Sequence, residues 1–162
     1  MKRSRQIEAM GLALLLLCGA CASTAPLPES RPITISEGLT RQNVEVAIIS
    51  ALTNRPPPEE YDPRLRLDDE TFKLFIWKHY IRDSGRAWMV ERRDPGAVTA
   101  AIIRREYYLQ VRVDYGRDAV NWQVTDSRGL DRENGRINRR AADWLEKLDL
   151  RLRHELGRMA YF

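Results

Sequence analysis

Apolar side chains occupy every second position between residues 107 and 115, and this is the clearest strand pattern in the chain. Because successive side chains of a β-strand point to opposite faces of a sheet, the pattern predicts a strand with one face in a core and the other in water. The predicted inward side chains are Tyr107, Leu109, Val111, Val113 and Tyr115, which alternate with Tyr108, Gln110, Arg112 and Asp114.

Shorter alternating stretches flank this strand, and short turns separate all of them. Residues 94–96 (Asp-Pro-Gly) and 116–118 (Gly-Arg-Asp) are turn sequences, and residues 104–106 form the remaining connection. Short turns join antiparallel neighbours, so the sequence predicts a four-stranded antiparallel meander. The expected inward residues are Trp88 and Val90 in the first strand, Val98, Ala100 and Ile102 in the second, and Val120, Trp122 and Val124 in the fourth.

One helix is predicted before the meander in the sequence and another after it. Thr40 is a suitable N-cap for a helix that ends near Leu52, and a longer helix is expected from about Ile137 to Leu156. Both carry an apolar stripe at helical spacing, which would lie on the apolar face of the sheet. The expected fold is therefore α+β, a two-layer sandwich with the N- and C-terminal helices packed on one face of the sheet.

The connection from residue 54 to residue 83 is an insert with two alternative interpretations. Three consecutive prolines, Pro56, Pro57 and Pro58, keep its start extended. A helix is expected to follow Asp68, although the same stretch alternates almost as well as a strand. Its apolar face either packs on the domain or forms, with the prolines, a partner surface. The residues of that candidate surface are Pro56, Pro57, Pro58, Phe72, Phe75, Ile76 and Tyr80.

The N-terminal residues have the order of a bacterial export signal. A basic head with Lys2, Arg3 and Arg5 precedes an apolar run from Ala9 to Leu17, followed by small residues around Cys21. The run is about half of the roughly twenty residues that a transmembrane helix needs. We therefore expect a cleaved signal peptide with lipid attachment at Cys21.

Two other interpretations of the leader remain. Cys18 stands where a lipoprotein signal usually has leucine, and the stretch from Ala20 to Ala22 also fits ordinary signal cleavage after Ala22. A redox or metal pair of Cys18 and Cys21 would need a folded frame, which a leucine-rich leader does not supply.

Composition narrows the possible chemistry. Both cysteines lie in the leader, so an exported domain has no thiol for catalysis, disulfides or metal binding. The chain has 27 basic and 23 acidic residues, and removal of the leader would leave 24 and 22. So small an excess is not the electrostatic pattern of a nucleic-acid-binding protein.

No arrangement of catalytic or metal-binding residues is expected. The only histidines, His79 and His154, have no sequence-near partner at metal-ligand spacing, and Ser127 lacks the surroundings of a nucleophile elbow. Acidic residues in the loop from Asp126 to Gly135 lack the alternation of a calcium-binding loop. Core packing is the expected role of the four tryptophans, Trp77, Trp88, Trp122 and Trp144.

The stretch from Val44 to Leu156 resembles a group of small proteobacterial lipoproteins of unknown function with an α-β-β-β-β-α order. The matching residues are Ala47-Ile48, Ala51-Leu52, Trp88, Val90-Glu91, Pro95-Gly96, Val111, Val113, Tyr115, Asp126-Ser127, Leu130, Ile137 and Trp144-Leu145. The chain departs from that group in its roughly thirty additional residues between Leu52 and Trp88. It also has Asn138, Ala141 and Ala142 where the family often carries His, Tyr and Asn. The resemblance implies a lipoprotein but supplies no activity.

Taken together, the sequence predicts a signal peptide at residues 1–20, a lipidated N-terminus and tether at 21–36, and one α+β domain at 37–162. The expected protein is a lipid-anchored envelope lipoprotein on the periplasmic face of the outer membrane. It is expected to act as a non-catalytic binding or assembly module, without a cofactor, that contacts another envelope protein. The alternative is an envelope hydrolase or glycan-binding protein.

Overall fold

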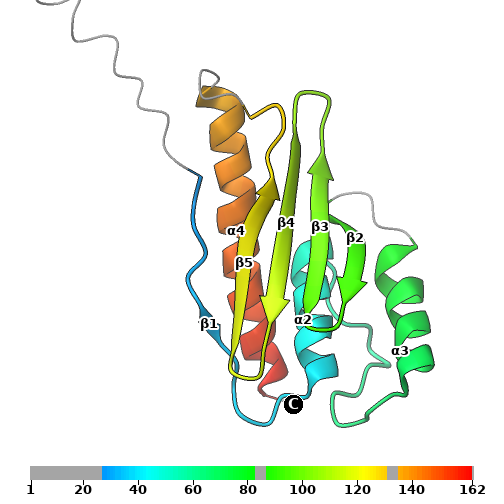
Figure 1. Ribbon diagram of the computed structural model, residues 1–162. Helices are drawn as coiled ribbons and strands as arrows, with labels where there is room; N and C mark the ends of the chain where they lie inside the picture. The colour runs from blue at the N-terminus through cyan, green and yellow to red at the C-terminus, as the bar shows by residue number, and fades with distance from the viewer. Residues whose placement is uncertain (1–26, 83–86, 131–134, 162) are drawn as a thin grey trace, which may run out of the picture.

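The structure is a computed structural model that describes residues 27–82, 87–130 and 135–161 (Figure 1). The predicted signal peptide and Cys21 lie outside these residues. Within them, one open antiparallel sheet of five strands has helices packed against it, with strand order β1-β5-β4-β3-β2. The strands are β1 (Ile33–Thr34), β2 (Met89–Asp94), β3 (Ala97–Ile103), β4 (Tyr108–Tyr115) and β5 (Ala119–Asp126).

The predicted meander forms strands β2 to β5, and its inward residues are those that the alternation indicates. All five residues that this alternation predicts to face inward are buried, from Tyr107, which precedes β4, at 5% exposed to Tyr115 at 7%. Val111 lies opposite Ala100 on β3 and Val124 on β5, so apolar side chains meet across the centre of the sheet. A short alternating pattern is therefore sufficient to place these strands.

A fifth strand, β1, lies in the stretch that the sequence analysis assigns to the tether. Ile33 and Thr34 pair with Val120 and Ala119 of β5, and the Ile35 amide donates to the Asp118 carbonyl at 2.9 Å. Ile33 and Ile35 are buried in the core. The fold thus starts before residue 37, and two paired residues are too few to give a periodic sequence signal.

Three α-helices and one π-helical turn accompany the sheet in the described part of the chain. The α-helices are α2 (Arg41–Thr53), α3 (Asp69–Ile76) and α4 (Gly135–Met159), and the π-helix η1 (Trp77–Ile81) continues α3. Helices α2 and α4 pack closely together on the same face of the sheet, and α3 stands beside β2 at the sheet edge (Figure 1). The expected α+β class is confirmed, with five strands in place of four.

Helix α2 lies at the centre of the fold. Every residue from Asn43 to Thr53 is buried, because the sheet, α4 and the insert surround the helix on all sides. Thr40 is its N-cap, as predicted: the threonine side chain accepts a hydrogen bond from the Asn43 amide. Asn54, at φ 55°, ends the helix in the left-handed conformation typical of C-terminal caps.

The insert packs on α2 through polar contacts as well as apolar ones. Gln42 exchanges two hydrogen bonds with the backbone of Leu67, at 2.6 and 3.0 Å. Asn43 donates to the Pro63 carbonyl at 3.0 Å and accepts from the Tyr61 hydroxyl at 2.7 Å. The insert is therefore integrated into the domain. Among the described residues, no helix combines the length and apolar character needed to cross a membrane.

Candidate interaction surface

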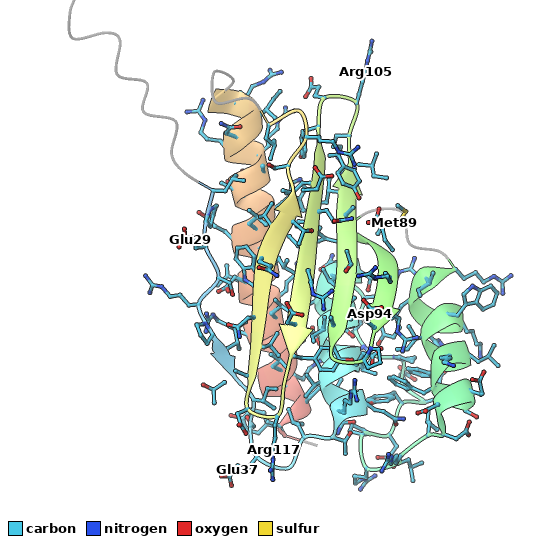
Figure 2. All side chains as sticks on the ribbon, in the orientation of Figure 1. Glu29, Glu37, Met89, Asp94, Arg105 and Arg117 are labelled. Atoms are coloured by element: carbon cyan, nitrogen blue, oxygen red, sulfur yellow. The ribbon has the colours of Figure 1, made fainter. Side chains whose placement is uncertain are left out.

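No helix of the described residues covers the face of the sheet opposite α2 and α4, and the larger side chains of this face stand open to solvent (Figure 2). Along β3 this face has the small residues Ala97, Thr99 and Ala101, which are at most 9% exposed, and it ends at Ile103, which is 54% exposed. Side chains of β2 and β4 meet across β3 in two polar groups and cover the small residues. The two groups are the walls of a shallow trough that crosses the sheet.

One wall of the trough is a connected hydrogen-bond network. The Tyr108 hydroxyl lies 3.0 Å from both carboxylate oxygens of Glu91, and Gln110 Nε2 donates to Glu91 at 2.7 Å. Thr125 Oγ1 donates to Gln110 Oε1 at 2.8 Å, which extends the network from β2 to β5. Partial burial and the adjacent Glu91 carboxylate raise the pKa of Tyr108.

The other wall is a row of alternating charges. Arg92 contacts Asp94 at 2.8 Å, and Arg112 bridges Asp94 at 3.8 Å and Asp114 at 2.8 Å. Between the two walls lies a hollow of about 460 Å³, lined by Glu91, Arg92, Thr99, Gln110, Arg112 and Thr125. Hydrogen-bond donors and acceptors, together with positive and negative side chains, thus line one open hollow. Such a lining suits the recognition of a polar partner surface.

A second polar cluster lies inside the fold, around Glu45 of α2. Arg93 Nε donates to Glu45 Oε1 at 2.6 Å, and the Tyr115 hydroxyl donates to Glu45 Oε2 at 2.8 Å. The Arg93 guanidinium also lies 5.5 Å from the ring centre of Phe72. Burial, with the Glu45 charge as the next cause, raises the pKa of Tyr115 to about 12.

The Glu45 cluster borders a cleft of about 510 Å³ that contains Arg41, Arg66 and Lys73. Asp69 and Asp94 line the same cleft, so its charges are nearly balanced. Both oxygens of Glu45 already have protein partners. We therefore interpret this cluster as a structural connection between α2, β2 and β4.

The candidate partner surface on the insert is largely covered. Phe72, Ile76 and Tyr80 are at most 5% exposed and pack in the core, and the Tyr80 hydroxyl lies 3.0 Å from Ser50 Oγ of α2. Phe75 is half-buried, with its ring centre 5.4 Å from that of Tyr61. Among the three prolines, Pro56 is exposed and Pro57 and Pro58 are half-buried. The exposed apolar side chains of α3 and η1 are instead Leu74 and Trp77.

The expectation that all four tryptophans pack in the core is wrong for Trp77, which is 51% exposed. Trp77 begins the π-helix, and its ring lies 6.0 Å from the guanidinium of Arg82. Its neighbours Ile76 and Tyr80 take the buried face of that element. Trp88 and Trp122 are buried and Trp144 is half-buried, as expected.

The remaining candidates stand apart from each other. His79 Nε2 lies 3.4 Å from Glu60, and His154 is exposed on α4. Asp126 pairs with Arg128 at 2.8 Å, and residues 131–134 of the candidate calcium loop lie outside the described residues. Within the described residues, no three His, Cys, Asp or Glu side chains are arranged to hold a metal ion.

The network of Glu91, Tyr108, Gln110 and Thr125 was not predicted from the sequence. Their outward orientation follows from strand alternation, which marks Gln110 as a polar-face residue. Their contact depends on strand register, including shifts between Val90 and Arg92 and between Gln110 and Val111, which a single sequence does not reveal. Comparisons with known proteins add no assignment: no family model, no curated protein and no solved structure matches the chain.

Proposed function

We propose that this chain is an exported envelope lipoprotein, anchored through a lipid on Cys21, whose domain binds another envelope protein without catalysing a reaction. The observation that carries the proposal is the order of basic head, apolar run and small residues that ends at Cys21. Its apolar run is about ten residues long, which suits a cleaved signal and not a spanning helix.

The mature protein would carry its lipid close to the folded domain. Cleavage before Cys21, diacylglyceryl attachment and N-acylation give more than one chain, and stable anchoring needs such a combination. Ala22 follows the cysteine, where an aspartate commonly retains lipoproteins at the inner membrane. The proposed location is therefore the periplasmic face of the outer membrane.

The proposed contact surface is the open sheet face. It combines the Glu91–Tyr108–Gln110 network with the charge row of Arg92 and Arg112 around small residues on β3. Tyrosine and arginine are enriched at protein interfaces, and this face presents Tyr108, Arg92 and Arg112. The surface lies on strands of one hydrogen-bonded sheet, which hold its side chains in fixed positions.

A glycan-binding role is the alternative, and Tyr108 is the aromatic residue on this face that it would use. Sugar binding to an aromatic platform needs one free ring face. The Arg128 guanidinium lies 4.6 Å from the ring centre of Tyr108 and occupies one face of the ring. This contact favours a protein partner over a glycan.

Metabolic labelling with an alkyne analogue of palmitate tests the anchor. We expect labelled wild type and no label on Cys21→Ser, because the thiol of Cys21 is the proposed acceptor. The matched control is Cys18→Leu, which restores the usual lipobox residue and should keep the label. Equal labelling of wild type and Cys21→Ser, or loss of label in Cys18→Leu alone, would refute the assignment.

In vivo photo-crosslinking tests the contact surface. A photoreactive residue at the exposed positions Asn121 or Gln123 of β5 reports on the open sheet face, and one at Lys147 of α4 reports on the opposite side. We expect the same crosslinked protein from both β5 positions and not from Lys147. A crosslink to glycan strands, or the same adduct from all three positions, would count against a protein-binding sheet face.

A further inference from the structure

One end of the domain is rich in arginine. It is formed by the β3–β4 turn, the segment that follows β5 and the start of α4, and its tip carries Arg105 (Figure 2). Described basic residues there outnumber the acidic ones, which are Glu106 and Asp126. The basic residues are Arg104, Arg105, Arg128, Arg136, Arg139 and Arg140.

Several of these guanidinium groups are available for an external partner. Arg105, Arg136 and Arg139 are exposed and have no ion pair within the described residues. Arg140 is 3.9 Å from Glu106, too far for a strong hydrogen-bonded pair. Ile103, 54% exposed, adds an apolar side chain at the same end.

The parts of this end are held together. The Tyr108 amide donates to the Arg128 carbonyl at 2.9 Å, so the segment after β5 is fixed to the start of β4. Gly129 packs so closely on the β3–β4 turn that a Cβ on it would lie 2.5 Å from the Glu106 carbonyl oxygen. The Arg104 guanidinium lies 5.6 Å from the ring centre of Trp144 on α4. The charges therefore sit on a rigid platform.

The opposite end has no such bias. Arg117 and Glu37 lie at that end (Figure 2), and Asp118 follows Arg117 in the β4–β5 turn. The cleft near the β2–β3 turn combines basic residues with acidic ones in nearly equal number, namely Arg41, Arg66, Lys73 and Arg93 with Glu45, Asp69 and Asp94. Charge is thus distributed unevenly along the long axis of the sheet.

The tether enters the fold near the arginine-rich end. Leu27 and Val124 line one hollow of about 520 Å³ beside β5. Val124 pairs with Val111, and the six residues from Val111 back to Arg105 span about 20 Å of strand and turn. The six residue steps from Leu27 back to Cys21 reach at most about 20 Å. A tether of this length allows Cys21 to reach the level of the Arg105 tip.

From this charge distribution and tether length, we propose that the arginine-rich end rests on the anionic phospholipid headgroups of the leaflet that holds the Cys21 lipid. The inference rests on the proposed lipid anchor. Guanidinium groups suit this role because their planar donors match phosphate oxygens in pairs. In this orientation the long axis of the sheet stands upright on the membrane and the open sheet face points parallel to the membrane surface. The open sheet face therefore remains accessible to a partner in the periplasm.

Vesicle co-sedimentation of the unlipidated mature chain tests the surface independently of the anchor. The protein is residues 21–162 with Cys21→Ser, which keeps the whole core cluster from Ile33 to Met159. The vesicles contain equal parts of phosphatidylglycerol and phosphatidylcholine, with pure phosphatidylcholine as the neutral comparison. The test variant combines Arg105→Gln, Arg136→Gln and Arg139→Gln. Its matched control removes the same charge elsewhere, with Arg66→Gln, Lys78→Gln and Arg117→Gln.

We expect the parent chain to bind the anionic vesicles and not the neutral ones. Each arginine at an anionic surface changes partitioning by about fivefold, so the test variant should lose about a hundredfold and the control much less. Equal losses in the two variants, or no binding of the parent chain to anionic vesicles, would overturn the proposal. Such a failure is separable from failure of the anchor, which palmitate labelling of Cys21 reports on its own. Melting curves of both variants check that these exposed substitutions leave the fold intact.

Discussion

The carboxylate of Glu45, on the central helix α2, accepts a hydrogen bond at 2.6 Å from Arg93 Nε on the edge strand β2. Tyr115 of β4 donates to the other carboxylate oxygen at 2.8 Å. A buried charge of this kind needs its partners, because its desolvation is otherwise uncompensated. The pair thereby fixes how the helix sits on the sheet.

Arg93→Met should therefore be strongly destabilising. Removal of the guanidinium leaves the Glu45 charge buried, which costs about 3 kcal/mol of the free energy of unfolding. The double variant Glu45→Met, Arg93→Met removes the charge as well and should recover most of that loss. Urea unfolding of the two variants measures the difference. A double variant no more stable than Arg93→Met would contradict the interpretation.

Ionisation of two buried tyrosines should lower the free energy of unfolding at high pH. Burial is the main cause that raises the pKa values of Tyr80 and Tyr115 from 10.0 to about 12 in the folded protein. The folded state favours the neutral phenol of both tyrosines. Their contribution to the free energy of unfolding is therefore complete below pH 10 and falls as the pH rises toward 12. The slope is at most about 1.4 kcal/mol per pH unit for each tyrosine. Unfolding free energies across this range should fall less steeply for Tyr80→Phe and Tyr115→Phe than for wild type.

The part of the fold that sequence predicts well depends on local repetition. The alternation from Tyr107 to Tyr115 identifies β4 and its buried face, because side-chain direction in a strand depends only on position. Thr40 likewise marks the start of α2, since an N-cap acts on the next few residues. These signals lie within a few residues of the structure that they predict.

The missed features depend on distant contacts. Strand β1 exists because Ile33 meets Val120, and the insert packs because Asn43 reaches Tyr61 and Pro63. The open-face network similarly joins Glu91 to Gln110 across a sheet whose register shifts near both residues. None of these contacts produces a periodic pattern of residues in the sequence. The sequence alone therefore predicts neither the fifth strand nor the candidate surface.

A charge placed on the buried face of β4 should be far more harmful than one on the open face of the sheet. Val111 is fully buried between β3 and β5, so Val111→Asp buries an unpaired carboxylate and is expected to cost more than about 4 kcal/mol. Gln123→Asp, at an exposed position of β5 opposite Arg112, should change stability by less than about 0.5 kcal/mol. Thermal melts of both variants check the two faces, and similar losses would mean that the strand register is wrong.

Gly129 should tolerate no side chain. Its φ is +75°, and a Cβ would lie 2.5 Å from the Glu106 carbonyl oxygen, so Gly129→Ala forces the backbone to move. We expect a loss of about 2 kcal/mol. Gly157→Ala is the matched control, because a Cβ on that helical glycine would meet no other part of the described structure within 4 Å. It should gain about 0.8 kcal/mol from helix propensity. Chemical denaturation of both variants gives the comparison, and a neutral Gly129→Ala would contradict the close approach of the two loops.

The structure makes the insert part of the core, so its removal should abolish folding. Replacing residues 56–83 with a short Gly-Ser linker uncovers one side of α2 and removes the buried Phe72, Ile76 and Tyr80. We expect no cooperative thermal transition from this deletion. A deleted chain that still melts cooperatively would show that the insert is an addition to a self-sufficient domain.

Single substitutions within the insert separate packing from surface exposure. Ile76 is fully buried and Leu74 is 65% exposed on the same helix, although both are aliphatic side chains of similar size. Ile76→Ala should cost about 3 kcal/mol through the lost burial and the cavity that it leaves. Leu74→Ala should cost less than about 0.5 kcal/mol, since its side chain already contacts water. Urea midpoints that shift equally for both variants would mean that α3 does not present its Phe72–Ile76 face to α2, and that this face is free for a partner.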